Sequence, residues 1–226
     1  MARVHKIRMG FSNAYLIQDE ADFVLVDAGH SNRARVFSQY LEKHGISPGQ
    51  IKLIVITHVH FDHVGSLKQI KKLCRCPVAI HEKEALLLRK GILVLPPGTN
   101  LFAKTASCLG RKFATRLMTF EAVEPDILCS KDLSLESFGI CGRIIPTPGH
   151  TDGSLSLLLA TGEAFVGDLA ANYLPFGLGP ICPPFAVNVP ELFKSWERLL
   201  SAGATKIFPA HGRPFPSELL SRRLLS

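Results

Sequence analysis

The stretch THVHFDH at residues 57–63 places three imidazoles and one carboxylate directly after the apolar run IKLIVI at residues 51–56. Five of the six residues in that run are β-branched or leucine, a composition that predicts a buried strand. Imidazole is the commonest metal ligand in proteins, and a neighbouring carboxylate suits zinc or a similar divalent ion. A solvated polar loop would explain a single histidine, but four ligand-type side chains within six residues indicate a metal site.

The spacing within this stretch indicates how ions can be shared. His58 and His60 lie two residues apart, so in an extended segment both side chains point to one side and can bind one ion. Asp62 and His63 are adjacent and therefore diverge, which allows them to bind a second ion from the loop that follows the strand.

The chain has the composition of a globular protein with one sizeable core. It holds 226 residues, of which 46% are hydrophobic and 20% are charged. No uncharged apolar run reaches about 18 residues, so we expect no transmembrane helix. The basic N-terminus, residues 1–8, precedes no apolar signal core, and we therefore expect a cytoplasmic protein.

Six cysteines are present, and only Cys74 and Cys76 are close together in the chain. Their C-x-C spacing differs from the C-x-x-C of zinc ribbons and redox motifs. An even count permits disulfides, but without an indication of secretion we expect reduced, mostly buried thiols.

Short strands with helices interspersed are predicted along the whole chain. The apolar periodicity and the turn residues indicate strands over 13–18, 23–27, 51–56, 77–80, 133–138, 143–147, 154–159, 164–167 and 206–209. They indicate helices over about 32–44, 64–73, 82–90, 190–202 and 217–225, with an irregular and then weakly helical segment over 91–125. This pattern is typical of a layered sandwich of helices and sheets.

Three further polar residues follow apolar runs, and each has a glycine close by. His150 lies in TPGHTDGS, Asp168 in FVGD and His211 in FPAHG. Glycine lets the backbone turn sharply and approach an ion closely. Each residue alone could be structural, but together with the first cluster they make seven candidate ligands, five histidines and two aspartates.

With the H-x-H-x-D-H motif at residues 58–63 and these three residues in order, the chain resembles a metallo-β-lactamase-fold hydrolase of the glyoxalase II-like branch. The segments 13–17 and 26–29 also resemble the opening strands of that family, and the likeness spans residues 11–213. It implies an α+β fold, a four-layer αββα sandwich with the metal site at one edge. We expect a single domain over residues 1–226, with a basic, apolar-rich insertion at about 85–125.

The resemblance also implies a dinuclear site. By it, His58, His60 and His150 bind the first metal, Asp62, His63 and His211 bind the second, and Asp168 bridges both. Zinc is the favoured metal, with iron or manganese as alternatives. Asp27 is either an outer residue that orients the ligands or a turn-forming aspartate before a glycine.

The implied reaction is hydrolysis of an ester-like carbonyl, a thioester or a lactone, by a hydroxide that bridges the two metals. The expected partner is a small acyl or thioester compound, which can be anionic. Asp62, Asp168 and Tyr173 are the expected catalytic residues. Tyr173 lies near the position where related lactonases carry a tyrosine, and the alternative is that it is a packing residue.

Other reactions of the same fold remain open. A mononuclear-iron sulfur (persulfide) dioxygenase is the main alternative. Asp168 argues against the zinc β-lactamases, which usually lack a bridging aspartate. Only about fifteen residues follow His211, which disfavours glutathione specificity. A nuclease or an RNA-binding protein is least favoured, because the nucleases of this fold carry extra arms or domains.

The net charge of +7 is concentrated in one segment. Residues 85–120 contain no acidic residue and six basic ones: Arg89, Lys90, Lys104, Arg111, Lys112 and Arg116. The segment is either a lid that binds an anionic or acyl substrate or a lipid surface, or a solvated basic face on a core-packing insertion.

Overall fold

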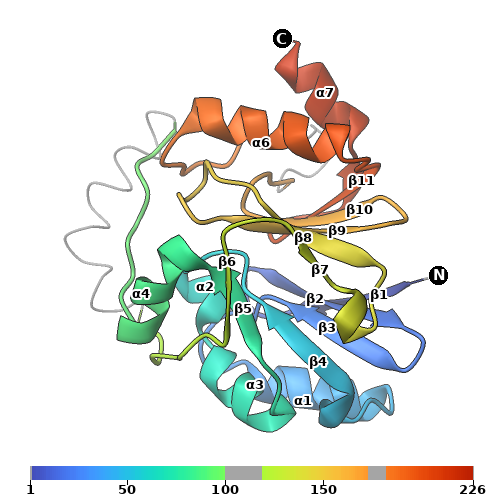
Figure 1. The fold of residues 1–226 in the computed structure, drawn as a ribbon. Coiled ribbons are helices and arrows are strands. Elements are labelled where there is room, and N and C mark those ends of the chain that lie inside the picture. Colours follow the sequence, from blue (N-terminus) through green and yellow to red (C-terminus); the bar gives the residue numbers. More distant parts are fainter. Residues whose placement is uncertain (1, 100–118, 173–181, 226) are drawn as a thin grey trace.

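Two mixed β-sheets pack face to face between two layers of helices, as Figure 1 shows. The computed structural model describes residues 2–99, 119–172 and 182–225, and within these residues each sheet has six strands. The predicted four-layer αββα sandwich is therefore confirmed.

The first sheet is built from the N-terminal part of the chain and has the strand order β1-β2-β3-β4-β5-β6. Its strands are β1 Arg3–Arg8, β2 Asn13–Asp19, β3 Asp22–Val26, β4 Ile51–Val55, β5 Val78–His81 and β6 Ile127–Cys129. The helices on its outer face are α1 Ala34–Lys43, α2 Phe61–Val64, α3 Leu67–Cys74 and α4 Glu82–Lys90, and the 3-10 turn η1 Pro48–Gln50 precedes β4.

The second sheet has the order β12-β11-β10-β9-β8-β7. Its strands are β7 Leu133–Ser134, β8 Gly142–Pro146, β9 Leu155–Leu159, β10 Glu163–Gly167, β11 Lys206–Pro209 and β12 Phe215–Pro216, with the 3-10 turn η3 Glu136–Phe138 between β7 and β8. The helices α6 Val189–Ser201 and α7 Glu218–Leu224 lie on its outer face.

Strand β4 shows why its sequence is apolar at almost every position. Its two edges pair with β3 and β5 in a parallel arrangement, and each of its two faces packs into a different apolar core. Leu53 and Val55 point into the core between the two sheets, and Ile54 points into the core under the helices. Successive side chains of a strand alternate between faces, so one buried strand serves two cores.

Three apolar clusters hold the four layers together. The cluster between the helices and the first sheet includes Phe37 and Leu67, and the cluster between the sheets includes Tyr15 and Phe165. The third joins the second sheet to α6 and α7 through Trp196, whose indole N–H donates to the Leu169 carbonyl at 2.9 Å.

Some elements differ from the sequence prediction. Strand β1 was not predicted because its basic residues hide a two-residue alternation, in which His5 and Ile7 are buried. It is an edge strand, where charged outward residues are common. The predicted strand over 133–138 is wrong beyond Ser134: the chain turns through η3, and Gly139, with φ of +76°, directly follows that turn.

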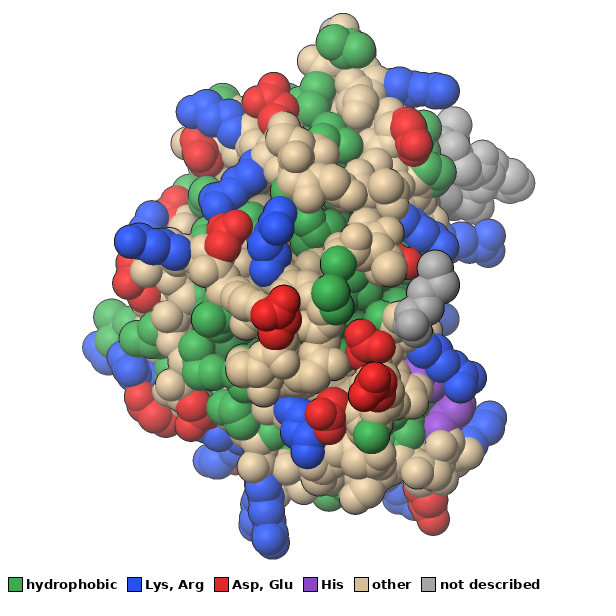
Figure 2. Space-filling model, turned by 45° about the vertical axis from the view of Figure 1, so that its right-hand side comes forward, with side chains coloured by type: hydrophobic (Ala, Val, Ile, Leu, Met, Phe, Trp, Pro, Cys, Tyr) green, Lys and Arg blue, Asp and Glu red, His purple; other side chains and the backbone are tan. Residues whose placement is uncertain are grey.

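Basic and acidic side chains lie beside one another across the face drawn in Figure 2. Among the ion pairs of the described residues, Arg198 and Arg143 both lie within ion-pair distance of Asp132, at 2.6 and 3.8 Å. Four of the six basic residues in the 85–120 segment, Lys104, Arg111, Lys112 and Arg116, lie outside the described residues, and Arg89 pairs with Glu124 at 2.8 Å.

Among the described cysteines, Cys74, Cys76 and Cys129 are free and buried, as predicted, whereas Cys141 is free and exposed. None of the helices in the described part of the chain has both the length and the apolar character needed to cross a bilayer.

Candidate metal centre

The seven candidate ligands all follow strands, and those strands end at one edge of the sandwich. The first four come after β4, His150 comes after β8, Asp168 directly follows β10, and His211 follows β11. Strands β10 and β11 are parallel neighbours, so their carboxyl ends meet. The amide hydrogen bond from Leu155 to the Thr57 carbonyl, at 2.8 Å, ties this edge of the second sheet to the first.

The first group of ligands brings three imidazole nitrogens together. His60 Nδ1 lies 2.9 Å from His58 Nε2 and 3.2 Å from His150 Nε2. All three side chains are buried. The extended backbone at His60, with φ of −125° and ψ of 153°, places His58 and His60 on one side, as their spacing predicted.

The second group contains Asp62, His63 and His211, whose ligand atoms also lie within 4.8 Å of one another. Asp62 and His63 belong to the short helix α2 and not to a loop, because α2 begins at Phe61 immediately after the extended segment. His211 Nε2 lies 3.1 Å from Asp62 Oδ2, and His63 Nε2 lies 3.8 Å from the same oxygen.

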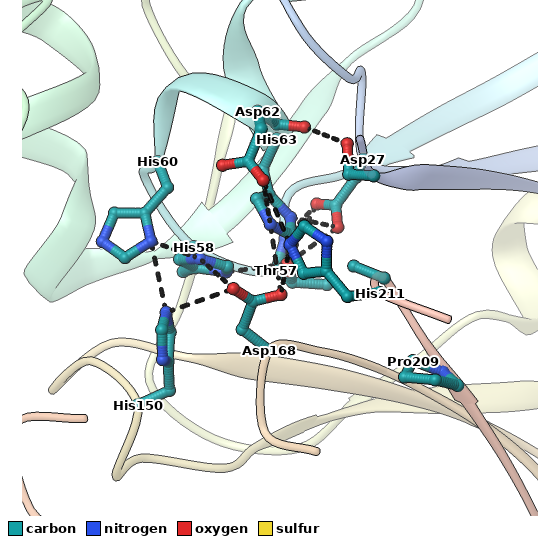
Figure 3. Close-up of polar contacts among 12 residues, drawn as sticks. Asp27, Thr57, His58, His60, Asp62, His63, His150, Asp168, Pro209 and His211 are labelled. Atoms are coloured by element: carbon teal, nitrogen blue, oxygen red, sulfur yellow. Dashed lines mark hydrogen bonds and ion pairs between the residues drawn. The ribbon is translucent and has the colours of Figure 1, made fainter. Parts of the chain in front are cut away.

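Asp168 lies between the two groups, as Figure 3 shows. Its Oδ2 faces the first group, 3.6 Å from His150 Nε2 and 4.0 Å from His58 Nε2. Its Oδ1 faces the second group, 3.3 Å from both His63 Nε2 and His211 Nε2. The carboxylate therefore presents one oxygen to each group.

Asp27 orients the segment at residues 57–63, which carries the first four candidate ligands. Its buried carboxylate accepts hydrogen bonds from the Thr57 backbone N–H at 2.9 Å and from the Thr57 hydroxyl. It also accepts from His63 Nδ1 at 2.8 Å. The backbone of Asp27 has φ of +61°, which is the left-handed turn that one interpretation of the sequence predicted. Its hydrogen bonds give it the orienting role of the other interpretation as well.

The hydrogen bonds on the outer sides of the rings favour metal binding on their inner sides. His150 Nδ1 donates to the Phe185 carbonyl at 2.8 Å, and His211 Nδ1 donates to the Phe11 carbonyl at 3.2 Å. When Nδ1 of a neutral imidazole carries the proton, Nε2 presents a lone pair, and ligating histidines are commonly fixed this way.

Among the described residues, three side-chain atoms of the cluster are buried without a hydrogen bond: His60 Nε2, His63 Nε2 and Asp168 Oδ1. The last two both face the second group. Buried polar atoms are normally paired, and a cation would satisfy both. The donor set, five imidazoles and two carboxylates, therefore fits divalent metal ions such as zinc or iron.

The two groups differ in protonation. Burial lowers the pKa of His58, His60 and His150, that of His60 to about 3, so these rings are neutral, the form that binds metals. Burial also lowers the pKa of His63 and His211, but at each ring the nearby carboxylates together outweigh it, led by Asp27 at His63 and by Asp168 at His211. The pKa of His211 is raised to about 10, and that of His63 lies well above its usual value.

The structure thus brings all seven predicted ligands together. Tyr173 lies outside the described residues, so its catalytic role stays a prediction. Two contributors were missed by the sequence reasoning. Ser12 donates to the Asp62 carbonyl at 2.5 Å, and Glu84, in the first turn of α4, accepts the Val59 N–H at 3.0 Å. Neither has a local signal that distinguishes it from an ordinary turn serine or helix glutamate.

A pocket of about 320 Å³ lies beside the loops that carry the first group. Its apolar lining comes from Val59, Leu87, Val94, Pro96 and Val187, and its polar lining from Lys83, Glu84, Thr151 and Asp152. Val59 lies between His58 and His60 in the chain. The volume is at the lower end of the range for small-molecule sites, roughly 300–1,000 Å³.

Comparison with known proteins places this site in a family context. The family model of the metallo-beta-lactamase superfamily matches residues 7–211. A probable metallo-hydrolase of Methanocaldococcus jannaschii is 31% identical over 204 residues, covering 89% of this chain and 87% of the relative. An acyl-coenzyme A thioesterase of Bos taurus is 24% identical over 237 residues, covering 93% of this chain and 76% of the relative.

Solved structures share the fold. A metallo-beta-lactamase family protein from Thermus thermophilus matches with a TM-score of 0.72 at 21% identity, over 99% of this chain and 78% of that protein. Another protein, solved in a di-iron-bound form, matches with a TM-score of 0.66 at 23% identity, over 93% of this chain and 92% of that protein.

Proposed function

The chain belongs to the metallo-beta-lactamase superfamily, and we propose that it is a dinuclear metal-dependent hydrolase of an ester-like carbonyl, a thioester or a lactone. The observation that carries this proposal is the orientation of Asp168, whose two oxygens face two different groups of ligands. A bridging carboxylate needs this arrangement. In the proposal, His58, His60 and His150 hold one ion and Asp62, His63 and His211 hold the other.

Two bound divalent ions would supply a water of near-neutral pKa and a positive charge for a carbonyl oxygen that becomes negative. The residues of this chain keep that arrangement in place. Asp27 and Thr57 fix the ring of His63, and the carbonyls of Phe185 and Phe11 fix His150 and His211. Asp168 sets the separation of the two groups and reduces their repulsion when both are occupied.

An acyl substrate is supported by two observations. The apolar pocket beside the first group has room for a short acyl chain. A relative with 24% identity is named an acyl-coenzyme A thioesterase. Zinc is our favoured metal on the donor set, with iron and manganese as alternatives, and a structural neighbour binds two irons.

One sample can test the proposal. Purified protein is first analysed for metals and then given thioesters, lactones, phosphodiesters, β-lactams and a persulfide. We expect about two metal ions per chain and fastest turnover on a thioester or a lactone. A single iron with oxygen consumption on persulfide addition would assign the dioxygenase reaction instead, and cleavage of only the phosphodiester would assign a nuclease.

A further inference from the structure

Glu84 is a buried carboxylate outside the seven-residue cluster, and it reaches the loop that carries two of the ligands. It is the third residue of α4 and only 4% exposed. Its Oε2 accepts the backbone N–H of Val59 at 3.0 Å. Val59 stands between His58 and His60, so this hydrogen bond holds the extended segment from which both rings project.

The same carboxylate reaches the loop of a third ligand. Thr151 and Gly153 both lie beside the Glu84 side chain, and Thr151 directly follows His150. Gly153 makes this approach possible, because a Cβ there would lie 2.5 Å from Glu84 Cγ and 3.0 Å from its Oε1. One side chain therefore connects the loops that carry His58, His60 and His150.

These contacts all belong to the first group of ligands. The second group is held by other residues, with Ser12 on the Asp62 carbonyl and Asp27 on the His63 ring. The position of Glu84 in the first turn of α4 also suits its charge, since a helix N-terminus favours an anion. The Glu84 contacts therefore serve the first group, whereas Thr57, which is held by Asp27, contacts one ring of each group, His58 and His63.

We propose that Glu84 is a positioning residue for the first metal subsite alone, setting the distance between the His58–His60 segment and His150. The inference rests on the proposed function, because it presumes that the first group binds an ion. Loss of an outer partner of metal ligands typically weakens binding by about 10–100-fold, and here the loss is expected at one of two sites.

The test measures the affinity of each metal equivalent in the full-length protein. Metal-free wild type, Glu84→Ala, Glu84→Gln and Gly153→Ala are titrated with Zn²⁺ against a chromophoric chelator. Glu82→Ala is the matched control, since Glu82 is exposed in the same first turn of α4. His150→Ala, which removes a ligand of the first group, identifies the equivalent that belongs there. Thermal unfolding of each metal-free variant reports whether it is folded.

We expect Glu84→Ala to weaken one equivalent by about 10–100-fold and to leave the other within about twofold. Glu84→Gln, which keeps one acceptor oxygen, is expected to weaken the same equivalent less, and Glu82→Ala to match wild type. Gly153→Ala displaces the carboxylate from the other loop and is expected to weaken that equivalent too. In the His150→Ala background, adding Glu84→Ala is expected to change the remaining affinity by no more than about twofold.

Wild-type affinity for both equivalents in Glu84→Ala would overturn the inference, as would equal weakening of both in a folded variant. If Glu84→Ala does not fold, unchanged affinities in Glu84→Gln and Gly153→Ala would overturn it. A wild-type protein that binds fewer than two ions would instead remove the dinuclear function and the inference with it. These results are distinguishable because the wild-type titration alone decides the second case.

Discussion

Asp168 illustrates how a single residue can join two sites. It is 14% exposed at its side chain, directly after β10, and each of its oxygens faces a different set of imidazoles. The pKa of this carboxyl lies well below its usual range, because His211 and His63 outweigh the effect of burial, so the group is ionised.

Replacing Asp168 by Asn therefore tests the bridging role. The amide keeps the shape but offers only one oxygen and no charge, so we expect loss of at least one metal ion per chain and a fall in kcat/KM of at least about 100-fold. Metal analysis and hydrolysis assays check both. Asp132→Asn, on the surface, is the control, and full metal content in Asp168→Asn would contradict the bridging assignment.

Asp27 offers a second test at the residue scale. Asn tolerates the left-handed backbone of position 27, so Asp27→Asn changes the side-chain chemistry with little effect on the turn. The His63 ring would lose its carboxylate partner, and we expect the metal equivalent of the second group to bind about 10–100-fold more weakly. A chelator titration measures this, and an effect confined to the first group would contradict it.

At the scale of elements, the residues at the start of a helix support the site. Helix α6 starts directly after the segment that supports His150: the Val187 N–H donates to the His150 carbonyl, and the Asn188 N–H donates to the Gly149 carbonyl. Asn188 is also the N-cap of α6, and its side chain accepts the Glu191 N–H at 3.1 Å.

The cap of α6 can be tested separately from the site. Asn188→Ala removes the acceptor for the Glu191 N–H and is expected to lower the free energy of unfolding by about 1 kcal/mol. Asn188→Ser retains a capping oxygen and is expected to lie close to wild type. Denaturant unfolding of the metal-free protein measures both, and equal stability of the Ala and Ser variants would show that the cap contributes nothing.

At the scale of the whole molecule, the candidate metal centre joins the two sheets. His58, His60, Asp62 and His63 follow a strand of the first sheet, whereas His150, Asp168 and His211 follow strands of the second. Each group of ligands draws on both sheets. Bound ions are therefore expected to hold the halves of the sandwich together at this edge.

Removal of the metals should accordingly lower the thermal stability. At free metal of 100 times Kd, each site adds about 2.7 kcal/mol to the free energy of unfolding, which corresponds to a Tm about 5–10 °C higher per site. Differential scanning calorimetry with and without a chelator measures the difference. The Asp168→Asn variant is expected to show a smaller difference. A Tm of the wild type that does not change with the chelator would contradict the expectation that bound ions hold the two halves of the sandwich together.

The sequence alone predicted the layers and the ligands because both have local signals. A buried strand is apolar at nearly every position, as in Ile51–Val55, where Lys52 is the exception, and ligand-type residues follow such runs next to turns and glycines. Within the described residues, strand β6 pairs with β5 alone and has three residues, so its formation depends on its neighbour and it was not predicted. Strand β1 was missed because three of its six residues, Arg3, Lys6 and Arg8, are solvent-exposed and basic.

The tertiary structure alone decided how the ligands are grouped and supported. The resemblance to a family implied which residues share a metal. Only the packing of the two sheets, however, turns one oxygen of Asp168 toward each group of ligands. The role of Glu84 is likewise invisible in its helix, since its partners Val59, Thr151 and Gly153 belong to two other loops. A local pattern reports on residues a few positions apart, whereas these contacts exist only once distant strand ends meet at one edge of the sandwich.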